Sequence, residues 1–141
     1  MPTLRVQVHD NLVALISLVV ALSALGYNSW RNELTERNRN IRDAGFELLA
    51  EIGSLQQVVF YAHFNPDDAR GDARMGWADV LTISDLAALM PAAVGRDAEA
   101  LRRTWQADWT GLGRDDDAHG RIDASIDVLR QATLESLAAL D

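Results

Sequence analysis

The chain has 141 residues, 48% hydrophobic and 24% charged, a composition typical of one folded domain and not of a disordered or low-complexity polymer. It contains no cysteine, which excludes a disulfide scaffold, thiolate metal sites and a cysteine nucleophile. Its 21 acidic residues outnumber 13 basic residues, all of them arginine, and the net charge of −8 argues against nucleic acid as a partner.

The first strong signal along the chain is an uncharged run of 16 residues, Leu12–Tyr27. Extended to Trp30 as a helix, it would rise about 28 Å, close to the roughly 30 Å hydrocarbon core of a bilayer. Tyr27 and Trp30 lie where an aromatic belt meets the membrane surface. We therefore predict a transmembrane helix over residues 11–30, preceded by a short N-terminal tail over residues 1–10.

Two other interpretations of this run remain open at the level of sequence. A cleaved signal peptide would use Ala24 and Gly26 as the small residues before a cleavage site, but Asp10 offsets the single basic residue of its amino-terminal region, Arg5. A buried core helix is the second alternative. A chain of this size rarely buries a helix that is apolar on every side.

The helix is expected to continue beyond the membrane, because no proline occurs between Pro2 and Pro66. Within a polar juxtamembrane segment over residues 31–43 an apolar stripe begins at Leu34. From Ile41 onward its apolar or small residues alternate at steps of four and three, the spacing of a helix packed along one seam. We predict one helix from about residue 8 to 63. The seam consists of Ile41, Gly45, Leu48, Ile52, Leu55, Val59 and Ala62.

Three more helices are expected over residues 74–90, 91–112 and 118–140, with Pro91 in the first turn of the second of them. Their apolar faces would pack on the seam, so we predict an all-α fold with a small antiparallel four-helix bundle over residues 44–141. The predicted faces are Trp77, Val80, Leu81, Ile83, Leu86 and Ala87; Val94, Ala98, Leu101, Trp105, Trp109 and Leu112; and Ile122, Ile126, Leu129, Thr133, Leu137 and Leu140. The tryptophans are interpreted as core residues, with a ligand-binding aromatic cage as the alternative.

Motifs that carry chemistry are missing from the sequence. No Glu-x-x-His pair, haem-attachment motif, phosphate-binding loop or nucleophile elbow is present. The three histidines are scattered, and the aspartates around Gly71 do not have the spacing of a calcium loop. We therefore expect no enzyme activity, no catalytic residue, no cofactor and no metal.

Small or polar residues follow one face of the predicted span at steps of three and four. This small-residue stripe consists of Ala14, Ser17, Ala21, Ala24 and Asn28. Small residues let transmembrane backbones approach closely, and serine or asparagine hydrogen-bonds across helices. The stripe therefore predicts contact with another transmembrane helix, from a second copy or a different subunit. The alternative is the ordinary composition of a lipid-facing helix.

Basic residues gather directly after the span. This Arg-rich collar consists of Trp30, Arg31, Arg37, Arg39 and Arg42. Against one arginine before the span, the four arginines of the collar favour a cytoplasmic bundle and contact with anionic lipid headgroups. The arginine-only composition suits a bacterial source, so the predicted location is the bacterial inner membrane.

Two functions fit these patterns. The first is a non-enzymatic accessory or scaffold subunit of a membrane complex, or a homo-oligomer. The alternative is a membrane-anchored sensor or signalling adaptor whose bundle binds a ligand and transmits through the first helix, with Gly45 and Gly53 as points of flexibility. A pocket beside the tryptophans would favour the sensor.

Overall fold

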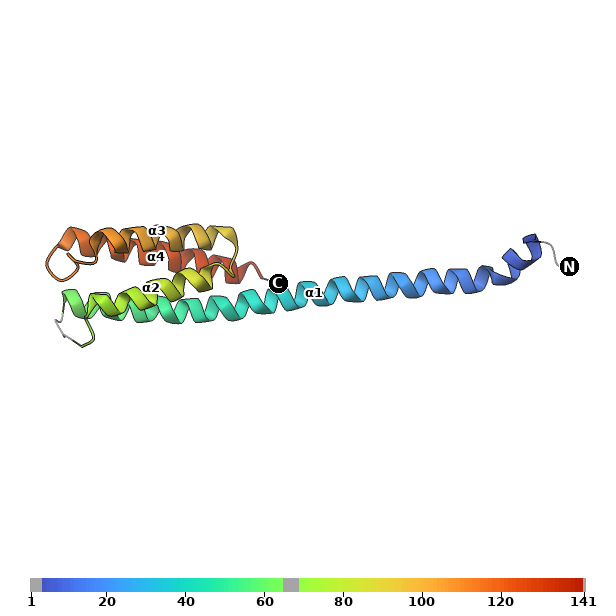
Figure 1. Cartoon of the computed structure of the whole chain (residues 1–141), viewed down its shortest axis with the longest axis horizontal. Helices are drawn as coiled ribbons and strands as arrows, with labels where there is room; N and C mark the ends of the chain where they lie inside the picture. The colour runs from blue at the N-terminus through green and yellow to red at the C-terminus, as the bar shows by residue number, and fades with distance from the viewer. Residues whose placement is uncertain (1–3, 65–68, 141) are drawn as a thin grey trace. The chain divides into compact units, whose positions relative to one another are not determined.

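The computed structural model describes residues 4–64 and 69–140, with side chains from residue 11 onward. All regular structure in this part is helical: α1 (Leu4–His63), α2 (Ala73–Ala87), α3 (Ala92–Asp108) and α4 (Asp116–Ala138) (Figure 1). The predicted all-α class is confirmed. The chain divides into two compact units, Met1–Asn38 and Arg39–Asp141, so α1 contributes to both.

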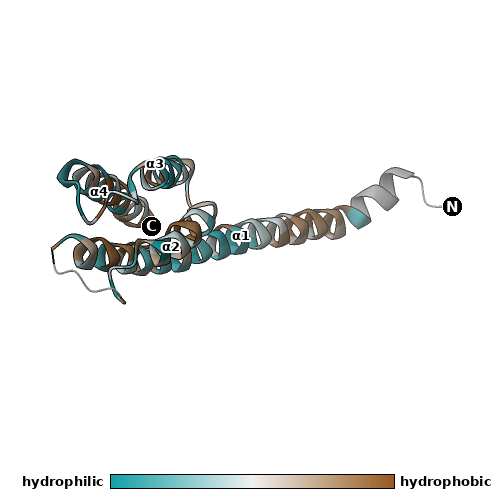
Figure 2. Cartoon of the chain, turned by 60° about the vertical axis from the view of Figure 1, so that its left-hand side comes forward, coloured by the Kyte–Doolittle hydropathy of each residue, from teal (hydrophilic) through white to brown (hydrophobic). Residues whose placement is uncertain are grey.

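The first helix is one unbroken element of 60 residues. It begins at Leu4, four residues before the predicted start, and ends at the predicted residue, His63. Figure 2 shows a hydrophobic stretch of α1 in brown, followed by a hydrophilic stretch in teal. The predicted helix-ending pair, Asn65 and Pro66, lies outside the described residues.

The four helices of the second unit pack together, and contacts at their ends give their directions (Figure 1). Near its start this part of α1 meets the end of α4, where Arg42 donates a hydrogen bond to the Leu140 carbonyl at 3.0 Å. At the other end of the unit, the last turn of α3 meets the first turns of α4 through an ion pair between Asp108 and Arg121 at 2.7 Å. Helix α4 therefore runs antiparallel to both α1 and α3.

The core is formed by one face of each helix. The predicted seam of α1 is buried from Leu48 to Val59, and α4 contributes the predicted face from Ile122 to Thr133. Trp105 is fully buried, while Trp77 and Trp109 are half-buried at the edge of the core. The core interpretation of Trp105 is confirmed. Leu81 was predicted to face the core but is 53% exposed.

Two glycines permit close packing in this core. A Cβ at Gly76 would clash with the indole ring of Trp105, so glycine at this position makes room for the ring against α2. A Cβ at Gly45 would lie 2.7 Å from Cδ2 of Leu137 and 3.1 Å from Cε of Met90. Gly45 is therefore a packing position between α1 and α4, and not the free point of flexibility that the sensor hypothesis assigned to it.

The predicted helix ends need correction at three places. Helix α2 ends at Ala87 and is followed by a turn over residues 88–90. The side chain of Met90, at the end of this turn, is buried in the core. Pro91 precedes α3 with extended backbone angles of φ −54° and ψ 148°, so it lies outside the first helical turn. Helix α3 ends at Asp108, and Leu112 is buried from the following turns.

Helix α4 begins two residues earlier than predicted, at Asp116. The side chain of Asp115 accepts hydrogen bonds from the backbone N–H groups of Asp117 and Ala118, at 2.9 and 3.3 Å. Asp115 is therefore the N-cap of α4, and its side chain satisfies two of the otherwise unpaired donors at the start of the helix.

Candidate functional site

The most distinctive surface of the chain is the apolar part of α1. One helix near the N-terminus is long and apolar enough to cross a membrane by length and composition, and none of its apolar window is buried in the structure. Large side chains such as Val13, Leu22 and Leu25 are 71%, 59% and 64% exposed. The interpretation of this segment as a buried core helix is therefore wrong.

The small-residue stripe lies within this exposed segment. Helix α1 carries all five of its residues, and their spacing places them along one side of the helix. Each of the five is exposed. The stripe is therefore an exposed surface of the first unit.

The Arg-rich collar is divided between the two units. In the first unit, the exposed ring of Trp30 contacts Tyr27, with ring centroids 6.3 Å apart, and Arg31 and Arg37 are exposed. Arg39 and Arg42 belong to the second unit. The bond from Arg42 to Leu140 places a positive charge at the negative end of α4, so this arginine stabilises the bundle.

Sequence reasoning missed a cluster of aromatic side chains at one end of the bundle. The rings of His63 and His119 stack with centroids 4.2 Å apart, and Phe64 packs edge-on against both. Nδ1 of His63 lies 3.1 Å from the Leu112 carbonyl, so this nitrogen carries the proton and donates it. Nε2 of His63 lies 3.4 Å from a carboxylate oxygen of Asp116.

This His63 cluster joins the end of α1 to the loop before α4 and to the first turns of α4. The side chain of His63 is only 15% exposed, although that of Asp116 is 95% exposed. Helix periodicity does not place His63 beside His119, because they lie on different helices and meet only when α1 and α4 pack. Among the described side chains, no group of three or more His, Asp or Glu residues is arranged to hold a metal ion.

Three acidic side chains, Glu47 and Glu51 on α1 and Asp79 on α2, lie close enough to interact. The pKa of Glu51 is raised by burial and by the neighbouring carboxylates of Asp79 and Glu47. Burial also raises the pKa of Asp79, while a hydrogen bond from Ser54 acts in the opposite direction. Ionised Glu51 therefore opposes folding at neutral pH.

Replacing Glu51 with glutamine is expected to stabilise the protein at pH 7 by about 0.2–1 kcal/mol, the scale of partly exposed charge pairs. A raised folded-state pKa means that stability is present at low pH and lost as the pH rises through that pKa. The advantage of Glu51→Gln should therefore shrink when urea unfolding is repeated near pH 4.

The matched control is Asp108→Asn, because the hydrogen bonds from Arg121 lower the pKa of Asp108. Its carboxylate contributes stability that is present above the ordinary pKa and lost as the pH falls through the folded-state pKa. The control should therefore destabilise the protein at pH 7. A Glu51→Gln variant less stable than wild type at pH 7 would contradict the assigned carboxylate repulsion.

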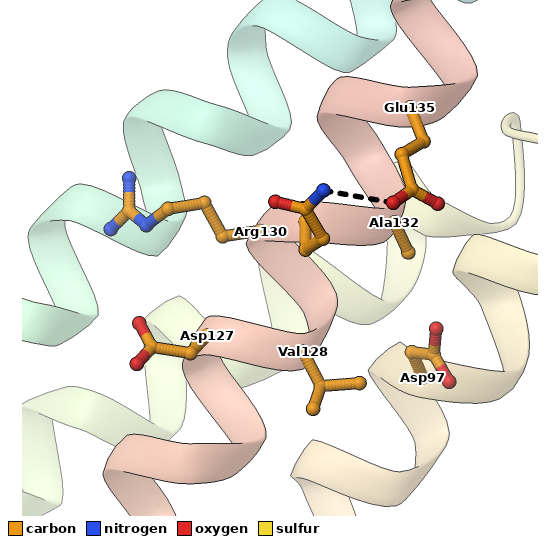
Figure 3. Close-up of a pocket in the computed structure, with 7 residues that line it drawn as sticks. Asp97, Asp127, Val128, Arg130, Ala132 and Glu135 are labelled. Carbon is orange, nitrogen blue, oxygen red and sulfur yellow. Dashed lines mark hydrogen bonds between the residues drawn. The ribbon is translucent and has the colours of Figure 1, made fainter.

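The surface between α3 and α4 is hollowed. An open hollow of about 570 Å³ is lined by Asp97, Asp127, Val128, Arg130, Gln131, Ala132 and Glu135. Figure 3 shows Val128 and Ala132 on the side of α4 nearest Asp97, whereas Arg130 points toward α1, where it donates a hydrogen bond to Gln56. A smaller neighbouring hollow of about 220 Å³ shares Asp97 and Val128. Neither of these two hollows is lined by a tryptophan.

Comparison of the chain with protein-family models, curated proteins and solved structures finds no match. The comparisons therefore assign no family, and the chain is described by its own structure. The described residues form four helices that pack together, and the N-terminal helix is long and apolar enough to span a membrane by length and composition.

Proposed function

We propose that the chain is a non-enzymatic single-pass membrane protein, an accessory or scaffold subunit of a membrane complex or a homo-oligomer. The observation that carries this proposal is the uncharged surface over residues 11–30, which the described parts of the chain leave exposed. Each large apolar side chain gains about 1.5–3 kcal/mol when it leaves water. A bilayer supplies the apolar surroundings that the bundle does not.

The interior of the bundle supports the scaffold over the sensor. Trp105 is fully buried beside Gly76, and it lines neither of the two hollows between α3 and α4. The bundle then acts as a rigid domain that the membrane segment holds at the surface.

The small-residue stripe is the proposed intramembrane contact. Its partner is another transmembrane helix, from a second copy or a different subunit. The stripe is exposed, and its short side chains permit the close backbone approach on which helix association in lipid depends. The larger apolar side chains on the rest of the helix would face lipid.

The membrane proposal is tested by alkaline carbonate extraction of membranes from cells that express the full chain. The protein is expected to stay in the membrane fraction with its N-terminal segment intact, because an integral helix resists removal of peripheral proteins. Release into the soluble fraction with a new N-terminus at Tyr27 would show that the segment is a cleaved signal peptide.

The Arg-rich collar gives the proposed orientation, with the bundle in the cytoplasm of a bacterium and the collar against anionic lipid of the inner membrane. Arg31 and Arg37 are exposed and available for this contact. A reporter enzyme that is active only in the periplasm, fused after Asp141, is expected to be silent. Strong activity from that fusion would reverse the orientation.

A further inference from the structure

The His63 cluster contains an imidazole ring whose two nitrogens both face oxygen atoms. Nδ1 donates its proton to the Leu112 carbonyl at 3.1 Å, and Nε2 lies 3.4 Å from a carboxylate oxygen of Asp116. A neutral imidazole carries one proton, so the bond at Nδ1 leaves Nε2 with a lone pair. That lone pair and an ionised carboxylate are both acceptors. The contact at Nε2 therefore lacks a donor unless His63 is protonated.

Protonation of His63 turns the same geometry into two matched contacts. In the imidazolium form both ring nitrogens donate, Nδ1 to the carbonyl and Nε2 to the carboxylate. The side chain of Asp116 is 95% exposed, so water can replace the contact when His63 is neutral and the carboxylate is free to turn away. The two protonation states therefore differ in whether the end of α1 is joined to the first turn of α4.

The stacked ring of His119 limits this arrangement to one proton. Its plane is tilted by 24° from that of His63 and the ring centroids are 4.2 Å apart, so a second positive charge would lie directly against the first. Phe64 packs edge-on against both rings and adds no charge. The groups that contact His63 are thus a carbonyl from the loop before α4, and a carboxylate and an imidazole from α4 itself.

We propose that the contact between His63 and Asp116 is a pH switch that joins α1 to α4 when His63 is protonated and opens when the proton is lost. Histidine is the side chain whose charge changes near physiological pH. A protonated histidine gains a partner in the folded state, so the stability from this contact is present at low pH and lost as the pH rises. The contact lies within the second compact unit, and it is independent of any partner of the membrane segment.

The proposal is tested by replacing Asp116 with asparagine, with Asp117→Asn as the matched control. Both aspartates are exposed residues in the first turn of α4, near the positive end of the helix, and of the two Asp116 is the one that contacts His63. Urea unfolding of the full chain in mild detergent compares each variant with wild type at about pH 5.5 and about pH 8, on either side of the range in which histidine ordinarily titrates.

The unfolding constant should respond to pH differently in the two variants. Asp116→Asn is expected to raise it, relative to wild type, by a factor about threefold larger at the lower pH than at the higher, the scale of an exposed ion pair. Asp117→Asn should raise it by the same factor at both. Equal pH dependence in the two variants would overturn the proposal.

A second comparison identifies the histidine that carries the proton. His119 lies three residues after Asp116 on the same side of α4, so it is the alternative partner of that carboxylate. The extra pH dependence of Asp116→Asn should persist when combined with His119→Phe, which keeps a ring in the stack without a titratable group. It should disappear when combined with His63→Gln. Persistence without His63, or loss without His119, would refute the switch, whereas the membrane proposal is judged separately by carbonate extraction.

Discussion

Replacing Trp105 with alanine is expected to lower the free energy of unfolding of the bundle by about 3–5 kcal/mol. The side chain is 0% exposed and fills the space beside Gly76 and Leu55. Within the described residues its Nε1 has no hydrogen-bond partner, so the loss comes from packing and the cavity left behind, and not from a broken hydrogen bond. Urea unfolding of the full chain in detergent, followed by circular dichroism, measures the effect.

Leu129→Ala, at a second fully buried position on α4, should cost about 2–5 kcal/mol for the same reason. Leu81→Ala is the control, because that side chain is 53% exposed and truncation should change stability by less than about 0.5 kcal/mol. Losses below half a kcal/mol at both Trp105 and Leu129, on the same scale as the control, would be incompatible with the described core.

Replacing Ala21 with leucine is expected to reduce association of the transmembrane helix with its partner at least tenfold, about 1.4 kcal/mol or more. Ala21 is the central residue of the small-residue stripe, and a larger side chain there would separate two helices that touch along it. The interaction depends on close approach, so added volume weakens it. Co-purification of membrane partners in mild detergent gives the measurement.

Leu18→Ala is the control for this replacement, because Leu18 lies outside the stripe and is 56% exposed. Its truncation should leave association almost unchanged. Neither variant should change the stability of the bundle, since both positions lie in the first compact unit. If Ala21→Leu keeps every membrane partner, the stripe is ordinary lipid-facing composition and the scaffold proposal loses its intramembrane contact.

Local patterns were enough to find the helices but not all their ends. The apolar residues of the core seam of α1 and of the faces of α3 and α4 recur every three or four residues. This spacing identifies the buried side of each helix, because residues three or four apart lie on the same side. The turn at residues 88–90 was missed. No glycine or proline lies within Ala87–Met90, so the local pattern does not mark this turn, from which Met90 is buried beside Gly45 of α1.

The sequence by itself determined the helical class, the uncharged span over residues 11–30 and the identity of most core residues, because these depend on the composition and period of contiguous segments. Tertiary structure alone decided which residues meet across helices. The stacking of His63 on His119 and the burial of Glu51 near Asp79 each join residues from two different helices. Packing also decided that Phe46 and Phe60 of α1 stay exposed while Leu48, Ile52 and Leu55 on the same helix are buried.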